Sequence, residues 1–260
     1  MAVDSGAEPL AAARIPSLPD SMFYIPNFIT SYDEDQILSK LPPNRWTVLS
    51  HRRLQAHPST LTANNTLLAA PLPPYLTTSP TPILEHFEKL GIFKDTPHGA
   101  PNHCLVNEYR RGEGIMPHED GAAYAPIVAT VSLGGTVVLE VTSKSVWEAN
   151  KKETDQQDEG PVAEKDGGQT RWRIVCEPRS LLVTTGSAYT TTLHGIPPVA
   201  VDPDLGPDTV ANWSLLGNPQ QYVEAGGKNE RGTRVSLTYR DVLKVSKAGG
   251  LGKILGGGRR

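Results

Sequence analysis

Two histidines and one aspartate are the residues whose types and spacing most directly suggest chemistry. His118 and Asp120 stand two residues apart. In an extended segment such residues point to the same face, so an imidazole and a carboxylate can reach one ion. His194 supplies a second imidazole from the apolar segment 192–196. Two histidines and one carboxylate suit a non-haem Fe(II) with open positions, although a surface turn with an unrelated buried histidine fits the same residues.

A strand-like segment near the C-terminus carries a second set of candidate residues. Its alternation places Arg234, Ser236, Thr238 and Arg240 on one face. Arginines that face a protein interior need an anionic partner. A dicarboxylate such as 2-oxoglutarate would satisfy both guanidinium groups. The exposed face of an edge strand would show the same alternation, so the residues alone leave both interpretations open.

Asn107 and Tyr109 show the same two-residue spacing just before His118. Their amide and phenol could hydrogen-bond a co-substrate. Burial with backbone partners is the other interpretation of these two side chains.

The surrounding pattern predicts the elements that must position these residues. Cap-type residues and acids before Ile37 predict a helix over 30–41, and a second helix is expected over 82–90. The short strands and their Gly and Pro turns favour an antiparallel sandwich or barrel. The predicted strands are Cys104–Tyr109, Ile127–Leu133, Thr136–Val141, Arg171–Val175, Ser180–Thr184 and Thr233–Arg240.

Composition excludes several classes of protein. The 260 residues include 25 Lys and Arg against 28 Asp and Glu, a net charge of −3, which excludes a bulk polybasic binder. The two cysteines cannot form a disulfide framework and favour a reducing compartment. No signal peptide and no membrane span are expected. We expect an intracellular protein, in the nucleus, the cytoplasm or both, that does not bind membranes and is a monomer.

The chain is predicted to hold one domain with three loosely structured segments. We expect a flexible leader over residues 1–21 and a single domain over 22–245. Within it, residues 148–170 carry many charges and almost no apolar side chain, which predicts a mobile acidic insertion. Residues 246–260 predict a flexible basic tail.

Several short motifs together resemble one family. They occur in the order and spacing of the AlkB-type Fe(II)/2-oxoglutarate dioxygenases, over residues 22–245. Segments 112–121 and 177–183 are most similar to the sixth class of eukaryotic AlkB homologues. The motifs are Asn107-Glu108-Tyr109, Gly114 to Pro117, His118-Glu119-Asp120-Gly121, Ser132-Leu133-Gly134, Leu193-His194-Gly195-Ile196, and residues 234–240 with Arg234 and Arg240 at their ends.

The resemblance implies a mainly β fold with flanking helices, a double-stranded β-helix or jelly roll. It implies Fe(II) as the cofactor, with 2-oxoglutarate and O2 as co-substrates. Ser236 stands where many family members have Asn. The residues that match the family's iron ligands are His118, Asp120 and His194, and those that match its 2-oxoglutarate contacts are Asn107, Tyr109, Arg234, Ser236 and Arg240.

The function that the resemblance implies is oxidative demethylation of N-alkylated bases in nucleic acid, DNA or RNA. Such a reaction releases formaldehyde, succinate and CO2, and it requires a flipped-out base or a single strand. The family's substrate lid corresponds to residues 44–76. Arg52, Arg53 and Tyr75 are the candidate substrate contacts there, although each alone is typical of a solvated loop.

Other functions remain open at this point. The same oxidation could act on a protein or a small molecule, because fold alone does not determine substrate. A binding or adaptor jelly roll without turnover would have no need for the whole set of five residues His118, Asp120, His194, Arg234 and Arg240. A zinc deaminase is poorly supported, because no Pro-Cys-x-x-Cys motif is present.

Overall fold

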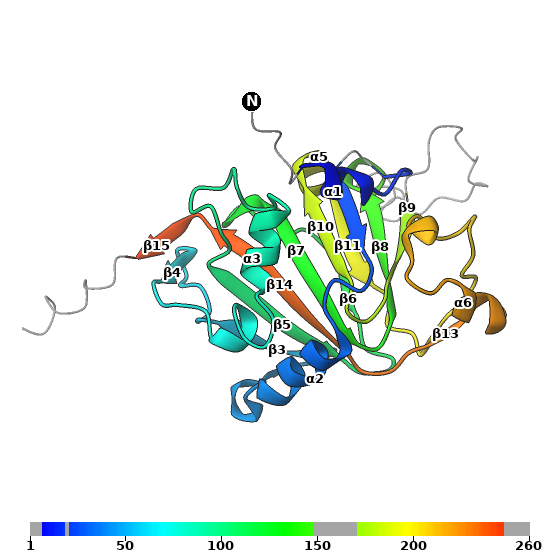
Figure 1. Ribbon diagram of the computed structural model, residues 1–260, viewed down its shortest axis with the longest axis horizontal. Helices are drawn as coiled ribbons and strands as arrows, with labels where there is room; N and C mark the ends of the chain where they lie inside the picture. Colours follow the sequence, from blue (N-terminus) through cyan, green and yellow to red (C-terminus); the bar gives the residue numbers. More distant parts are fainter. Residues whose placement is uncertain (1–6, 19–20, 148–170, 247–260) are drawn as a thin grey trace, which may run out of the picture.

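The computed structural model describes residues 7–18, 21–147 and 171–246, and these form two antiparallel sheets packed face to face (Figure 1). The large sheet has the strand order β1-β10-β7-β14-β5-β3-β2, and the small sheet has the order β6-β11-β8-β9. Two short pairs, β12 with β13 and β15 with β4, lie outside these sheets. This arrangement confirms the predicted mainly β fold with flanking helices and agrees with a jelly roll.

The six predicted strands all occur in the structure, with bounds that differ from the prediction by one to three residues. The strands are β1 (Met22–Ile25), β2 (Thr47–Leu49), β3 (Arg52–His57), β4 (Thr66–Leu68), β5 (His103–Tyr109), β6 (Ile115–His118), β7 (Tyr124–Gly134), β8 (Val137–Ser143), β9 (Arg171–Cys176), β10 (Leu181–Thr185), β11 (Thr192–Ile196), β12 (Val201–Asp202), β13 (Asn229–Glu230), β14 (Arg234–Val242) and β15 (Lys244–Ser246). The helices are α1 (Ala7–Ala12), α2 (Ser31–Lys40), α3 (Ile83–Lys89), α5 (Gly186–Thr191) and α6 (Gln220–Glu224), with short 3₁₀ turns at Pro43–Arg45, Pro74–Leu76 and Trp213–Leu215.

The two faces of the large sheet have different partners. Strand β14 lies between β5 and β7, and all nine of its residues are buried. Its odd-numbered residues, Val235, Leu237 and Tyr239, pack with apolar residues of α2 and α3 in what we call the helix-side cluster. Its even-numbered residues face the small sheet, as strand alternation requires. The interpretation of residues 234–240 as an exposed edge strand is therefore wrong.

Both predicted helices form and cover the outer face of the large sheet (Figure 1). Helix α2 begins with a capping box, in which Thr30 and Asp33 satisfy each other's backbone N–H groups, and it buries Ile37. Helix α3 buries Ile83 and Phe87. Each helix therefore uses one apolar stripe to support the strands that carry the candidate site.

The predicted flexible leader is wrong for the described residues 7–18. Residues 7–12 form α1, and Ile15 and Leu18 are buried at 0% and 5% exposure. They belong to the inter-sheet cluster, an apolar group that includes Met22 and Leu182 of the large sheet and Val141 of the small sheet. The Ile15 N–H donates to the carbonyl of Met22 at 2.9 Å. These two apolar side chains have no helical or strand period, so sequence pattern could not reveal that they fill the core. The predicted acidic insertion and nearly all of the predicted basic tail lie outside the described residues, and Ser246 belongs to β15.

The long connection between β12 and β14 packs on the small-sheet side. Arg231 forms a buried, two-point ion pair with Asp202, at 2.9 Å from Nε and 2.5 Å from Nη2. Trp213 and Tyr222 from the same connection pack against the inter-sheet cluster. No helix of the described residues is long and apolar enough to cross a membrane.

Candidate active site

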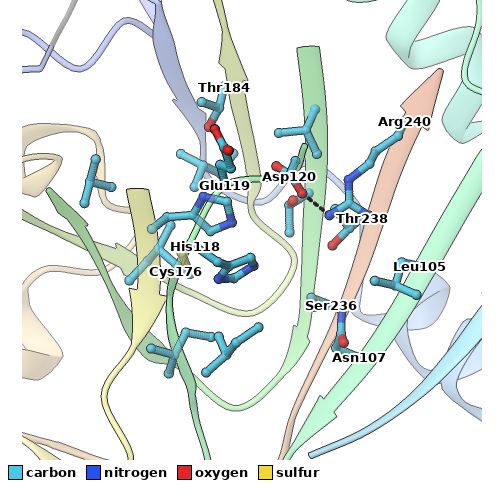
Figure 2. A pocket seen from close by; sticks show the side chains of 18 of the residues that line it. Leu105, Asn107, His118, Glu119, Asp120, Cys176, Thr184, Ser236, Thr238 and Arg240 are labelled. Carbon is cyan, nitrogen blue, oxygen red and sulfur yellow. Dashed lines mark hydrogen bonds and ion pairs between the residues drawn. The ribbon is translucent and has the colours of Figure 1, made fainter. Parts of the chain in front are cut away.

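A cavity of about 260 Å³ lies between the two sheets, and residues far apart in the sequence line it (Figure 2). The large sheet contributes the pocket-facing residues of β5, β7 and β14, while the small sheet contributes residues of β6 and β11. Their positions follow from strand register, because Arg234 lies opposite Tyr109 and Ser236 opposite Asn107. Register between antiparallel strands therefore assembles the site.

The two predicted imidazole ligands meet across a pair of strands. His194 on β11 lies directly opposite His118 at the end of β6, and their ring centroids are 4.5 Å apart. The Nδ1 of His118 donates to the carbonyl of Met116 at 2.8 Å, because a carbonyl can only accept. In the neutral tautomer this contact leaves the lone pair on Nε2, the nitrogen that could bind an ion. Burial lowers the pKa of His194 to about 4, so the ring is neutral and able to ligate at neutral pH.

Asp120 lies just beyond β6 and forms a buried ion pair with Arg240 (Figure 2). Burial opposes ionisation of this carboxyl, but Arg240 and the two imidazoles outweigh burial and lower its pKa. Asp120 is therefore a carboxylate at neutral pH. The Arg240 guanidinium also lies over the ring of Tyr124, 5.0 Å from its centroid.

The donor set at this end of the cavity fits Fe(II) in type. Two imidazoles and one carboxylate form the two-histidine, one-carboxylate set of non-haem Fe(II) sites. Within the described ranges, no three His, Cys, Asp or Glu side chains converge closely enough to hold an ion as they stand. At this site the Arg240 guanidinium engages the Asp120 carboxylate. With a metal ion bound, the Asp120 carboxylate would contact both the ion and Arg240.

Arg234 lies at the other end of the cavity and fits an anionic co-substrate. Its side chain is buried with 4% exposure, and its Nη2 donates to Ser132 Oγ at 3.0 Å. Its Nε is buried and has no hydrogen-bond partner. A buried guanidinium without a carboxylate partner is costly, so the arrangement favours an anion in the cavity beside it. The distal carboxylate of 2-oxoglutarate is such an anion.

The other predicted co-substrate residues lie between these two ends. Asn107, Tyr109 and Ser236 all line the cavity, and burial raises the pKa of Tyr109, which keeps its phenol protonated. Their amide and hydroxyl groups supply neutral donors and acceptors along the floor formed by β5 and β14. The structure therefore brings together all eight residues predicted for iron and co-substrate.

The predicted substrate residues separate into two groups. Arg52 lines the cavity and donates from Nε to Asn107 Oδ1 at 3.3 Å. Arg53, the next residue on β3, points to the opposite face, where it pairs with Glu108 at 2.7 Å and lies over the Trp46 ring. Tyr75 packs against His57 and the helix-side cluster. Arg53 and Tyr75 therefore do not line the cavity, and strand alternation is the reason for Arg53.

Sequence reasoning missed several residues that shape the cavity. Ser132 on β7 accepts a hydrogen bond from Arg234, and the Tyr124 ring lies under the Arg240 guanidinium. Tyr189 on α5 donates to the Gly121 carbonyl at 3.0 Å and so fixes the turn after Asp120. Alternation within the predicted strand 127–133 could have indicated the pocket-facing position of Ser132. No sequence signal links Tyr189 to the site, because that contact depends on tertiary packing.

Comparison with known proteins gives the family. Residues 21–240 match the 2OG-Fe(II) oxygenase superfamily. The probable RNA/DNA demethylase ALKBH6 of Danio rerio is 34% identical over 233 residues, which cover 88% of this chain and 89% of that protein. The alkylated DNA repair protein ALKBH8 homolog of Arabidopsis thaliana is 26% identical over 193 residues, 70% of this chain and 52% of that protein.

Among solved structures, OsALKBH1 is 16% identical over 86% of this chain and 99% of its own, with a TM-score of 0.43. Family membership follows from the sequence match, which extends over most of the chain and includes every residue of the candidate site. The chain belongs to the 2OG-Fe(II) oxygenase superfamily, as an AlkB-type dioxygenase that uses Fe(II), 2-oxoglutarate and O2.

Proposed function

We propose that this protein removes methyl groups oxidatively from N-methylated bases in nucleic acid, with release of formaldehyde, succinate and CO2. The cavity's two ends support the oxygenase half of this proposal. The names of the relatives from Danio rerio and Arabidopsis thaliana, a probable RNA/DNA demethylase and an alkylated DNA repair protein homolog, support a nucleic-acid substrate.

We assign Fe(II) to His118, Asp120 and His194. The His118 ring is oriented by Met116 O, and the His194 ring is neutral because it is buried. Arg240 holds the Asp120 carboxylate in its ionised form, the form that binds a metal. When bound, iron with 2-oxoglutarate and O2 supplies the oxidising power for a strong C–H bond, while the protein positions that bond and limits access of water.

We assign 2-oxoglutarate to the space between Arg234 and the histidine pair. Arg234 would take the distal carboxylate with its unpartnered Nε, and Asn107 and Tyr109 would bind along the chain of the keto acid. Ser236 would contribute one hydroxyl, which reaches less far than the Asn of many relatives. Arg240 would lie near the carboxylate at the metal end. The proposal rests chiefly on one observation: Arg234, buried with an unpartnered Nε, lines the same cavity as the histidine pair.

The experiment that tests the oxygenase site is an anaerobic titration of the full chain with Fe(II) and 2-oxoglutarate. We expect the weak visible charge-transfer band of a chelated keto acid in the wild type and its loss in Asp120→Asn. Asparagine preserves the size of the side chain and can still accept from Arg240, so thermal unfolding should change little. A folded wild type without the band would contradict the assignment.

A second measurement tests the substrate. Formaldehyde release should depend on methylated single-stranded RNA or DNA and should be absent in Asp120→Asn. If 2-oxoglutarate is consumed but no methylated oligonucleotide yields formaldehyde, the nucleic-acid part of the proposal is wrong. A protein or a small molecule would then be the substrate of the same oxidation.

A further inference from the structure

Three arginines line the cavity, one more than the co-substrate needs. Arg234 and Arg240 lie on β14. Arg52 is the first residue of β3 and follows the turn that joins β2 to β3. Leu54 lies opposite Asn107, so alternation along β3 also places Arg52 on the cavity side. Arg52 is half-buried, unlike the two buried arginines of β14.

Only one of the three guanidinium nitrogens of Arg52, Nε, forms a hydrogen bond to a described residue. Its Nε donates to Asn107 Oδ1, and neither Nη atom bonds to any described residue. Both Nη groups are solvent-accessible, since neither is a buried atom without a partner. Asparagine has one carbonyl and one amino group on its side chain, so the Nε contact turns the Asn107 amino group away from Arg52. The Nη groups therefore remain available to a further ligand beside the cavity.

Arg52 has no counter-ion among the described residues around the cavity. The two acidic residues that line the cavity are already paired, Asp120 with Arg240 and Glu119 with Lys144. No carboxylate among the described residues forms an ion pair with Arg52. Of the two carboxylates of 2-oxoglutarate, one is assigned to Arg234 and the other to the metal end. A further anion is needed to match Arg52.

We propose that Arg52 binds a backbone phosphate of the nucleic-acid substrate through its Nη groups while its Nε holds Asn107. The planar fork of arginine matches two oxygens of a phosphate, and a half-buried guanidinium loses little hydration when it binds. This inference rests on the proposed function and names the part of the substrate that is recognised beside the base. Arg52 would thereby connect the bound phosphate to the co-substrate residue Asn107.

The test compares Arg52→Gln with Arg53→Gln in the full chain. Both variants lose one positive charge at neighbouring positions, but Arg53 points away from the cavity. The probe is a fluorescent single-stranded oligonucleotide, with affinity measured by anisotropy at several salt concentrations under anaerobic Fe(II) and 2-oxoglutarate. Thermal unfolding checks that both variants are folded.

Arg52→Gln should weaken binding about tenfold for RNA or DNA of any base sequence. The slope of log affinity against log salt should become shallower by about 0.7, the value for one phosphate contact on a single strand. Arg53→Gln should leave both quantities close to wild type. Arg52→Lys should restore the salt slope, because lysine supplies the charge, but only part of the affinity, because it lacks the fork.

Two results would overturn the inference and leave the proposed function standing. One is unchanged oligonucleotide affinity in Arg52→Gln with a large loss of 2-oxoglutarate affinity in the charge-transfer titration, which would make Arg52 a co-substrate ligand. The other is an equal loss in both glutamine variants, which would show an effect of total charge. If the wild type binds no oligonucleotide but binds a fluorescent acidic peptide, and Arg52→Gln weakens that binding, the nucleic-acid function and the inference both fail.

Discussion

At the scale of single residues, the burial of Arg234 favours an anionic ligand in the cavity. Arg234 is buried on a central strand, it keeps a single hydrogen bond to Ser132, and its Nε has no partner. Such a group is unfavourable until an anion arrives, so part of the free energy of co-substrate binding comes from relieving this unpaired charge. The neighbouring Cys176 thiol lines the same cavity, and burial raises its pKa, so it adds no negative charge.

Arg234→Lys should raise the KM for 2-oxoglutarate by about tenfold or more, with a smaller effect on kcat. Lysine keeps the charge but loses the planar fork, and its ammonium cannot occupy the positions of both Nε and Nη2. Steady-state succinate formation against 2-oxoglutarate concentration measures this split. Arg171→Lys, at an exposed arginine paired with Glu140, is the matched control and should behave as wild type. An unchanged KM in Arg234→Lys would remove this residue from the co-substrate site.

At the scale of elements, the pairing of β6 with β11 sets the distance between the two histidines. The pairing is irregular, since His194 lies opposite His118 but Ile196 lies opposite Ile115. Gly195 makes this irregular contact possible. A Cβ on Gly195 would lie 2.9 Å from the nitrogen of Pro117 and 3.0 Å from the carbonyl oxygen of Ile115. The backbone of β6 therefore lies directly against Gly195.

Gly195→Ala should destabilise the protein by about 1–3 kcal/mol, because the added methyl group presses on backbone that cannot rotate away. The displaced β6 should also weaken Fe(II) affinity, since His118 moves relative to His194. Urea unfolding and the charge-transfer titration measure the two effects. Gly206→Ala is the control, because a Cβ there meets only Thr209 Oγ1 at 4.0 Å. Equal stability of the two variants would mean that β6 adapts without cost.

At the scale of the whole molecule, buried neutral histidines link folding to pH. His57 and His103 are buried at 0% and 2% exposure. Burial lowers the pKa of each to about 4, with Arg45 adding to the effect at His57 and Arg240 at His103. Arg45 donates to Nδ1 of His57 at 3.2 Å, a contact that requires the neutral ring. An unfolded chain would titrate these histidines near a pKa of about 6.5.

Stability should therefore fall as pH decreases through the range from about 6.5 to about 4, because the unfolded state binds more protons there. Above about pH 7 these histidines should contribute no pH dependence. Each group should contribute a slope of up to about 1.4 kcal/mol per pH unit. Urea unfolding of the metal-free protein as a function of pH measures the slope. His103→Asn should reduce it, whereas His51→Asn, at an exposed histidine, should not. An unchanged slope in His103→Asn would show that this ring is protonated in the folded state.

The sequence by itself indicated which residues share the cavity, and it located the longer strands and the two helices α2 and α3. Strand alternation placed Arg234, Ser236 and Arg240 on one face, and the cap signals located α2, because both depend only on local spacing. The ordered motifs also identified the family. Strand boundaries differed by a few residues, because hydrogen bonds across the sheet extend strands beyond their apolar run.

The tertiary structure decided what depends on contacts between distant segments. Because β3 pairs with β5, Arg52 faces the cavity and Arg53 faces the opposite side of the sheet. Tyr75 packs against the helix-side cluster and does not line the cavity. The tertiary structure also brought Ile15 and Leu18 into the core and paired Asp120 with Arg240. A local pattern tells which residues share a face of a strand. Only the packing of the sheets determines what that face meets, because the partner lies far away in the sequence.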